Sequence, residues 1–327
     1  AQGYISRLIE KGYKVAICDQ VEDPKAAKGL VKREVVRVVT PGMIIEDELL
    51  DAKTNNFILA LSRHQHMTGL ASLDISTGTF RLTETADINA LLDEIMRVAP
   101  REILLPESLK SDAAFSPLIK EDRISAVTVV EDRSFEFAGS RQRLLEQFDT
   151  LSLEGFGCES MKAGVGAAGA LIHYVTETQR QKINHLTAVQ TYFLGQFLVV
   201  DDQSCRNLEL SANIRTGSRQ GTLLGILDRT VTAMGGRLMA HWLRYPQLDP
   251  VQIQVRFDAV AEAVGKMQIR RELRESLKPV RDLERLGSKI SMGHGNARDL
   301  TALKHSLLAV SEIFSARSHL SAAPSRY

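Results

Sequence analysis

Three acidic residues lie on or beside predicted strands, where their carboxylates could gather around a metal ion. Asp74 belongs to a strand expected at 67–75, while Glu102 and Asp132 lie near the ends of other expected strands. Hydrolysis of a phosphodiester by two metal ions needs three or four such groups around one point. A magnesium-dependent nuclease that uses Asp74 is therefore one hypothesis. In the alternative, Asp74 anchors the turn ISTG at 75–78 through its side chain.

A glycine-rich run, AGVGAAGA at 163–170, has the spacing of two nucleotide-binding motifs. A dinucleotide-binding fingerprint also needs a preceding strand and an acid about 20 residues later, and neither is predicted here. A phosphate-binding loop needs Lys and then Ser or Thr, where this run continues with Ala170 and Leu171. We predict instead a helix whose small residues let it pack close to a sheet.

Histidine and cysteine offer no convincing site. His64 and His66 lie in an expected hairpin turn, and two histidines without further ligands do not make a metal site. Cys18, Cys158 and Cys205 are far apart and odd in number, so they fit neither a disulfide framework nor a zinc ribbon. Cys18 follows an apolar strand, and we expect it to be buried. We therefore predict no catalytic, cofactor or metal residue.

The net charge of +1, from 41 basic and 40 acidic residues, excludes a small basic protein held to nucleic acid by bulk charge. Residues 55–185 carry 13 basic and 18 acidic side chains, net −5, and suit a protein partner better than phosphate. Residues 186–327 carry 19 basic and 13 acidic side chains, net +6. The apolar runs are shorter than the ~18 residues of a membrane span, so we expect no membrane contact. The three scattered cysteines indicate a reduced, cytoplasmic protein.

The hydrophobic pattern changes along the chain and divides it into parts. Residues 1–42 predict a helix ended by Gly12 and two strands, and 43–55 a linker or surface helix. Residues 56–83 predict three antiparallel strands. Further elements are expected as a helix at 86–99, strands at 102–105 and 124–130, and helices at 139–148 and 160–181. This element order is that of a ribonuclease H-like α/β domain.

Strand signals fade after about residue 205. Thr232, Asp249 and Asn296 are expected helix N-caps, and Asn296 with Asp299 forms a weak capping box. The helices are expected at 221–229, 232–244, 249–264, 268–277, 279–291 and 296–316. The predicted fold class is therefore α/β plus all-α, with a partial mixed α/β segment at the N-terminus.

The most specific pattern lies at 205–246, where CRNLEL at 205–210 predicts a helix, a polar flexible loop follows, and TLLGILDRT and VTAMGGRLMAHWLRYP predict two helices joined at Thr230. Gly235 and Gly236 would let another backbone approach the start of the second helix. Leu238, Trp242 and Leu243 are expected to form a buried stripe. The stretch thus predicts helices in close contact with a neighbouring segment.

This stretch resembles the core or lever domain of the bacterial MutS family, the mismatch-recognition ATPases of DNA repair. The residues that carry this resemblance, all in a structural role, are Arg206, Asn207, Leu208, Glu209, Thr230, Met234, Gly235, Arg237, Leu238 and Trp242. The N-terminal YISRLIEKGYKVAICDQVEDPKAAKG and REVVRVVTPG resemble the end of the MutS mismatch-binding domain. ASLDISTGTFRL, GFG and AAGALIHYVTETQR resemble its connector domain, and DLERL continues the match.

The resemblance implies an internal fragment of such a protein. Its parts would be a remnant of the mismatch-binding domain at 1–42, a linker at 43–55, the ribonuclease H-like connector at 56–186 and the first part of the helical core at 187–327. The family's mismatch-reading motif, Gly-x-Phe-Tyr-Glu, does not occur, and neither does a phosphate-binding loop. We therefore expect no mismatch reading, no enzymatic activity and no cofactor in this segment.

The resemblance also implies what the full-length protein does. It would bind mismatched duplex DNA, use ATP and magnesium, and form a homodimer. The connector domain of this family contacts MutL, the next repair factor. The expected role of this segment is to link the mismatch-reading end to the ATPase end and to offer MutL a docking surface.

Overall fold

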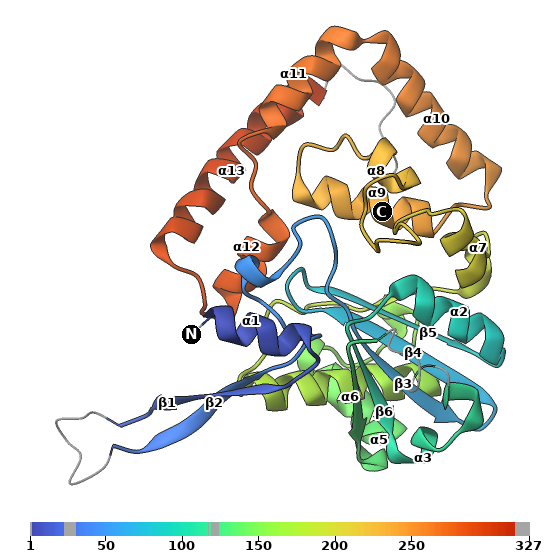
Figure 1. Ribbon diagram of the computed structural model, residues 1–327, viewed down its shortest axis with the longest axis vertical. Helices are drawn as coiled ribbons and strands as arrows, with labels where there is room; N and C mark the ends of the chain where they lie inside the picture. Colours follow the sequence, from blue (N-terminus) through green and yellow to red (C-terminus); the bar gives the residue numbers. More distant parts are fainter. Residues whose placement is uncertain (1, 23–30, 117, 119–123, 318–327) are drawn as a thin grey trace. The chain divides into compact units, whose positions relative to one another are not determined.

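The computed structural model describes residues 2–22, 31–116, 118 and 124–317 (Figure 1). The chain folds into two compact units. The first contains Ala1–Leu50 and Asn56–Phe193, and the second contains Asp51–Asn55 and Leu194–Tyr327. The residues 51–55, here named the linker segment, thus interrupt the first unit in sequence but belong to the second.

The first unit begins with a helix and a two-stranded hairpin. Helix α1 (Gln2–Glu10) stops just before Gly12, which has a positive φ of 79°, and the two expected strands follow as β1 (Val15–Gln20) and β2 (Arg33–Val39), which pair antiparallel. Cys18 is exposed, so the expectation that it is buried was wrong. Two strands alone form no second layer that could cover the side chain of Cys18.

A six-stranded sheet forms the centre of the first unit, in the order β7-β6-β3-β4-β5-β8. The antiparallel strands β3, β4 and β5 confirm the predicted meander, and β6 and β7 run parallel to β3. The strands are β3 (Ile58–His64), β4 (Met67–Asp74), β5 (Thr79–Thr85), β6 (Glu102–Pro106), β7 (Ala126–Val130) and β8 (Gln190–Thr191). The short edge strand β8 was not expected.

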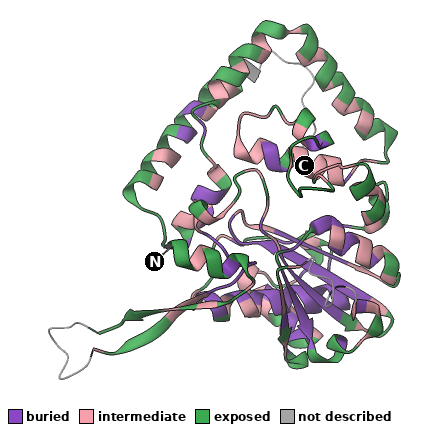
Figure 2. Cartoon of the chain, in the orientation of Figure 1, coloured by how far each residue is buried: buried purple, intermediate pink, exposed green. Residues whose placement is uncertain are grey.

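Helices cover both faces of this sheet, whose strands are largely buried (Figure 2). On one face Leu61, Leu70 and Ile103 pack with Ile95 of α2 (Ile88–Val98). Successive residues of a strand point to opposite faces. The other face therefore meets α6 (Lys162–Gln179), which packs in turn against α5 (Phe137–Phe148); the short α3 (Glu107–Lys110) follows β6.

The glycine-rich run lies inside α6, as predicted, and not in a loop. A Cβ on Gly69 of β4 would lie 2.1 Å from the backbone carbon of Ala163, and one on Gly169 would lie 2.3 Å from Cβ of Ser140. The run therefore serves the close approach of α6 to the sheet and to α5, and it has no strand-and-loop geometry for a nucleotide.

The second unit is helical. Its helices are α7 (Asp202–Asn207), α8 (Leu223–Leu227), α9 (Ala233–Arg244), α10 (Pro250–Gly265), α11 (Met267–Leu277), α12 (Leu283–Ser291) and α13 (Ala297–Arg317). The predicted N-caps are confirmed: Thr232 accepts from Gly235 N–H and Asp249 from Val251 N–H.

The predicted capping box at α13 is also confirmed. Asn296 accepts from the N–H groups of Arg298 and Asp299, and the Asp299 carboxylate accepts from Asn296 N–H. Each partner thus satisfies backbone donors of the first turn. No helix of the described chain has the length and apolar character that a bilayer span requires.

Candidate functional site

Asp74 does not behave as a metal ligand. Its side chain is fully buried and accepts hydrogen bonds from Ser76 N–H (3.0 Å), Ser76 Oγ (2.7 Å) and Asn56 N–H (3.2 Å). These contacts fix the turn after β4 and join it to the residue before β3. The alternative in which Asp74 anchors a turn is therefore the one that the geometry supports.

Glu102 and Asp132 are held in two further, separate networks. The buried Glu102 accepts from Thr128 Oγ1 and Tyr174 OH, both at 2.7 Å, whereas Asp132 accepts from Ser108. Among the residues that the structure describes, no three His, Cys, Asp or Glu side chains form a group that could hold a metal ion. The nuclease hypothesis therefore lacks structural support.

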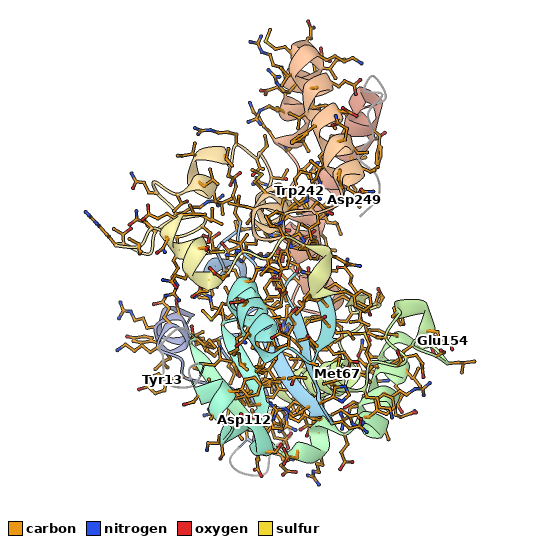
Figure 3. All side chains as sticks on the ribbon, turned by 90° about the vertical axis from the view of Figure 1, so that its right-hand side faces the viewer. Tyr13, Met67, Asp112, Glu154, Trp242 and Asp249 are labelled. Carbon is orange, nitrogen blue, oxygen red and sulfur yellow. The ribbon has the colours of Figure 1, made fainter. Side chains whose placement is uncertain are left out.

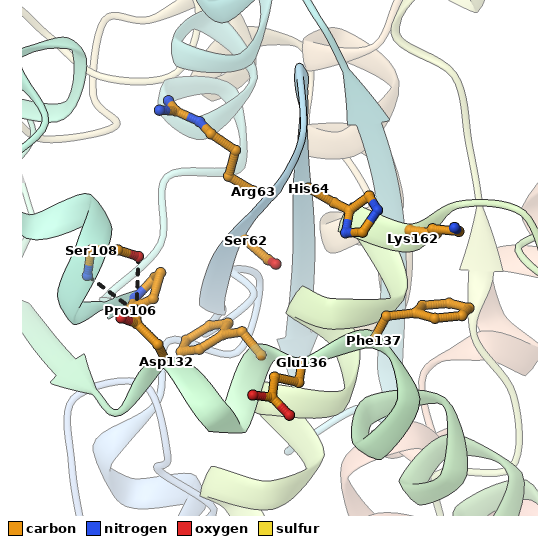
Figure 4. A pocket seen from close by; sticks show the side chains of 10 residues that line it. Ser62, Arg63, His64, Pro106, Ser108, Asp132, Glu136, Phe137 and Lys162 are labelled. Carbon is orange, nitrogen blue, oxygen red and sulfur yellow. Dashed lines mark hydrogen bonds between the residues drawn. The ribbon is translucent and has the colours of Figure 1, made fainter.

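Asp132 and His64 line a shallow pocket of about 340 Å³ at the carboxyl ends of β3 and β6 (Figure 4). Figure 4 shows Asp132 bonded to Ser108, whose Oγ lies 2.8 Å away. Arg63 pairs instead with Asp112 at 2.6 Å. Arg63 is therefore already paired within the protein, and Asp132 is held by the backbone and hydroxyl groups of Ser108.

The densest polar arrangement of the helical unit surrounds the linker segment. Three of its backbone carbonyl groups accept hydrogen bonds from two buried arginines. Arg285 donates to the carbonyls of Asp51 (3.0 Å) and Thr54 (2.8 Å), and Arg237 donates to that of Ala52 (2.8 Å). Because a buried guanidinium group needs acceptors for its N–H donors, these bonds from two buried arginines hold the exposed backbone of the segment in one conformation.

The side chain of Lys53 completes this arrangement. Its ammonium group lies 3.1 Å from Asp228 Oδ2, 3.1 Å from the Thr230 carbonyl and 3.0 Å from Thr230 Oγ1. The aliphatic part of Lys53 lies on Gly236 of α9, where an added Cβ would be 2.6 Å from its Cγ and Cδ. The predicted close approach is thus made at Gly236 alone and by a side chain of the linker segment, not by its backbone, whereas the neighbours of Gly235 are Thr230 and Thr232.

Charge pairing makes this arrangement rigid. Arg237 binds both carboxylate oxygens of Asp282 (2.6 and 2.8 Å) and one of Glu284 (2.6 Å). We name the whole arrangement the linker clasp; it consists of the linker segment with Asp228, Thr230, Arg237, Asp282 and Arg285.

The carboxylates of the linker clasp are stabilised in their charged form. Burial alone would raise the pKa of Asp228, but hydrogen bonds from Thr230 and Lys53 outweigh it and hold that pKa below its ordinary value. Burial likewise opposes ionisation of Asp282, whose pKa is nevertheless lowered by its bonds to Arg237. The linker clasp is therefore a network of ionised groups at neutral pH.

The residues that carried the family resemblance fall into two groups. Thr230 and Arg237 belong to the linker clasp, and Gly235 donates its N–H to the cap of α9. The others lie outside the linker clasp. Arg206 pairs with Asp202, Asn207 ends α7, and Glu209 accepts from Ile214 N–H. Leu208 and Leu238 are exposed, and Met234 and Trp242 are half-buried.

Two expectations for this stretch were wrong. The first helix begins at Asp202 and ends at Asn207, because Glu209 adopts a left-handed backbone conformation (φ 47°). The expected buried stripe is not formed, since Leu238 is 45% exposed and Trp242 (Figure 3) is stacked under the Arg256 guanidinium, 4.0 Å from its ring centre.

Sequence reasoning missed half of the linker clasp. Asp282 and Arg285 lie in DLERL, which was noticed only as part of the resemblance. Lys53 and Asp228 carry no signal, because a lysine in a polar linker and an aspartate after a short helix are both ordinary surface residues. The partners become visible only when residues some 175 positions apart are brought together.

Comparison with known proteins identifies matches along most of the chain. Family models match in chain order: MutS domain I at 1–48, MutS domain II at 56–187 and MutS domain III at 203–326. The DNA mismatch repair protein MutS of Desulforapulum autotrophicum is 52% identical over 327 residues, 98% of this chain and 36% of that protein.

Two further relatives bear the same name. The protein of Desulfosudis oleivorans is 52% identical over 310 residues, 95% of this chain and 35% of that protein. The protein of Symbiobacterium thermophilum is 47% identical over 316 residues, 96% of this chain and 36% of that protein. The chain thus spans little more than a third of the length of these relatives, and its linker segment falls between the first two family models.

Proposed function

Because this chain belongs to the MutS family, we propose that it links the mismatch-reading end of a mismatch-recognition ATPase to its ATPase end. The observation that supports this role is the linker clasp. The linker segment joins the parts that match domains I and II, yet residues of the part that matches domain III hold it.

A clasp of this kind suits a relay. Its bonds are directional and charged, so a shift of α9 or α12 either carries the linker segment along or breaks several bonds together. A packed polar network therefore favours discrete arrangements over gradual bending. In this proposal mismatched DNA, ATP, magnesium and the homodimer belong to the full-length cytoplasmic protein, and this segment transmits between their sites without chemistry of its own.

The relay is tested in a full-length relative in which this chain replaces the matching segment. Lys53→Met removes the ammonium group that bonds Asp228 and Thr230, and Lys278→Met, at an exposed pair with Glu275, is the matched control. We expect Lys53→Met to reduce the effect of a mismatched duplex on ATP turnover, while ATP turnover without DNA and the control variant stay unchanged. An unaltered mismatch response in Lys53→Met contradicts the relay.

We also propose that residues 56–187 form a ribonuclease H-like connector. Three antiparallel strands are followed by two strands parallel to the first, and the sheet order β5-β4-β3-β6-β7 places the first strand between the second and the fourth. This order supports the assignment made from the element sequence. The proposal concerns the fold alone, because the acids do not form a metal site.

The second part of the proposed role is docking of MutL on this connector. Leu151 is 95% exposed at the tip of a loop that the structure holds firmly. The Glu159 carboxylate accepts from Leu153 N–H (2.6 Å) and pairs with Arg141 (2.6 Å), and Phe148 stacks on Phe156 at 4.9 Å. A rigid loop that presents an apolar side chain suits a protein contact, because little entropy is lost on binding.

Binding of purified MutL from the same source to the 327-residue chain tests this contact. We expect Leu151→Asp to weaken binding by about tenfold or more, as for the loss of a central apolar contact. Ile226→Asp alters a similarly exposed side chain of the helical unit (61% exposed) and serves as the matched control. Equal affinity of the wild type and both variants would place the MutL contact elsewhere.

A further inference from the structure

The two carboxylate oxygens of Glu102 serve two different parts of the first unit. Oε1 accepts from Thr128 of β7 and Tyr174 of α6, both at 2.7 Å. Oε2 accepts from the Thr40 hydroxyl and from Gly42 N–H, the latter at 3.2 Å. The donors to Oε1 lie in the part that matches MutS domain II, and those to Oε2 lie in the part that matches domain I.

Neighbouring groups adapt to this carboxylate. Lys14 of the hairpin lies 3.7 Å from Oε1 and donates to Tyr174 OH at 3.1 Å, so it supports the same network with a positive charge. A Cβ on Gly42 would lie 2.8 Å from Cβ of Ile58 and 2.9 Å from Cβ of Glu102. Only glycine lets the backbone N–H at position 42 come this close.

The burial of Glu102 makes these contacts mandatory. Its side chain is fully buried, as is that of Thr40, so no water replaces a lost donor. A carboxylate offers two acceptor oxygens, whereas a glutamine amide offers one oxygen and an NH₂ group. One of the two sets of donors would therefore face the wrong group in a glutamine variant.

We infer that Glu102 is a positioning residue that joins the end of the domain I part to the connector sheet, so that the two parts shift as one body. This inference deepens the proposed relay and rests on it for its functional meaning. Residues of the helical unit then hold the linker segment through the linker clasp, while Glu102 holds Thr40 and Gly42, which precede that segment in the sequence.

We name the contact of Glu102 with Thr40 and Gly42 the joint. Hydrogen exchange of the 327-residue chain tests the joint directly, with the peptide covering 38–45 as the readout. Thr40→Val removes a donor to Oε2 only, and Thr128→Val makes the same change at Oε1. We expect Thr40→Val and Glu102→Gln to speed exchange in this peptide by about tenfold or more, the scale of a lost hydrogen bond to a charged group. Thr128→Val should leave the peptide within about twofold of the wild type, since the Oε2 contacts remain.

The outcomes separate the joint from the relay. Exchange at the wild-type rate in peptide 38–45 of Thr40→Val overturns the inference. If Glu102→Gln speeds exchange throughout the sheet, the result for Thr40→Val is the one that decides. The full-length chimera with Thr40→Val then reports on the relay through its preference for mismatched over matched duplex. Faster exchange with an unchanged preference keeps the joint and rejects the relay.

Discussion

Lys53 shows that the contribution of a charged residue to the free energy of unfolding depends on the burial of its partner. Its Asp228 partner has a side chain only 4% exposed, whereas the partners Lys278 and Glu275 are 62% and 68% exposed. We expect Lys53→Met to lower the free energy of unfolding by about 1–3 kcal/mol, because it takes a donor from a buried carboxylate. Lys278→Met should change it by less than about 0.5 kcal/mol.

Urea unfolding followed by the fluorescence of Trp242, the single tryptophan, measures both variants in the helical unit. Equal midpoints for Lys53→Met and Lys278→Met would show that the linker clasp does not stabilise this unit.

Asp228 gives the linker clasp a dependence on pH. Its folded-state pKa is depressed, since the bonds from Thr230 and Lys53 outweigh burial. A depressed carboxyl pKa contributes stability that is present above the unfolded value of about 4 and is lost as the pH falls toward the folded value. We expect the urea midpoint of the wild type to fall below about pH 4, and that of Asp228→Asn to fall less steeply over the same range. Parallel curves for the two proteins would contradict this assignment.

Single residues were predicted only as far as their local surroundings decide their role. The turn-anchoring role of Asp74 was a stated alternative, because ISTG follows it directly. The exposure of Cys18 and the stacking of Trp242 on Arg256 depend on which element covers them, and sequence periodicity does not contain that information.

Among elements, α9 is limited by the segment that crosses it. Gly236 lies under Lys53, whose Cγ would be 2.6 Å from an added Cβ, whereas Gly287 of α12 has open space. Gly236→Ala should therefore destabilise the helical unit by about 1–3 kcal/mol through overpacking. Gly287→Ala should stabilise it by about 0.5–1 kcal/mol through helix propensity alone. Thermal unfolding should shift in opposite directions; an increase in both would show that the linker segment yields at no cost.

Elements with their own start signals were predicted well. The helices that begin at Thr232, Asp249 and Asn296 carry caps in the sequence, and turn residues separate the apolar strands of the meander. The edge strand β8 has two residues and no local pattern, because pairing with β5 alone defines it. The path of the linker segment was missed for the same reason, since its partners are distant in sequence.

In the molecule as a whole, the linker segment should resist cleavage although it connects separate parts of the chain. Trypsin cuts after Lys53 only when the clasp opens, because the bond lies between carbonyls held by Arg237 and Arg285. Arg285→Ala removes the bonds to Asp51 and Thr54 and should speed this cut by about tenfold or more. Arg298→Ala, at an exposed arginine of α13, should not. Mass spectrometry of timed digests gives the rates; equal cutting in both variants would mean that the segment is already open.

The linker clasp also changes where this chain can be recombined with a relative. A crossover placed between the parts that match domains I and II would combine one parent's linker segment with another parent's Asp228, Arg237 and Arg285. Exchange of the connector therefore requires that residues 51–55 be inherited together with the helical unit. Hybrids that keep residues 51–55 with the helical unit of the same parent should fold. Hybrids joined between the parts that match domains I and II should be less stable, because they lose the match between Lys53 and the buried Asp228.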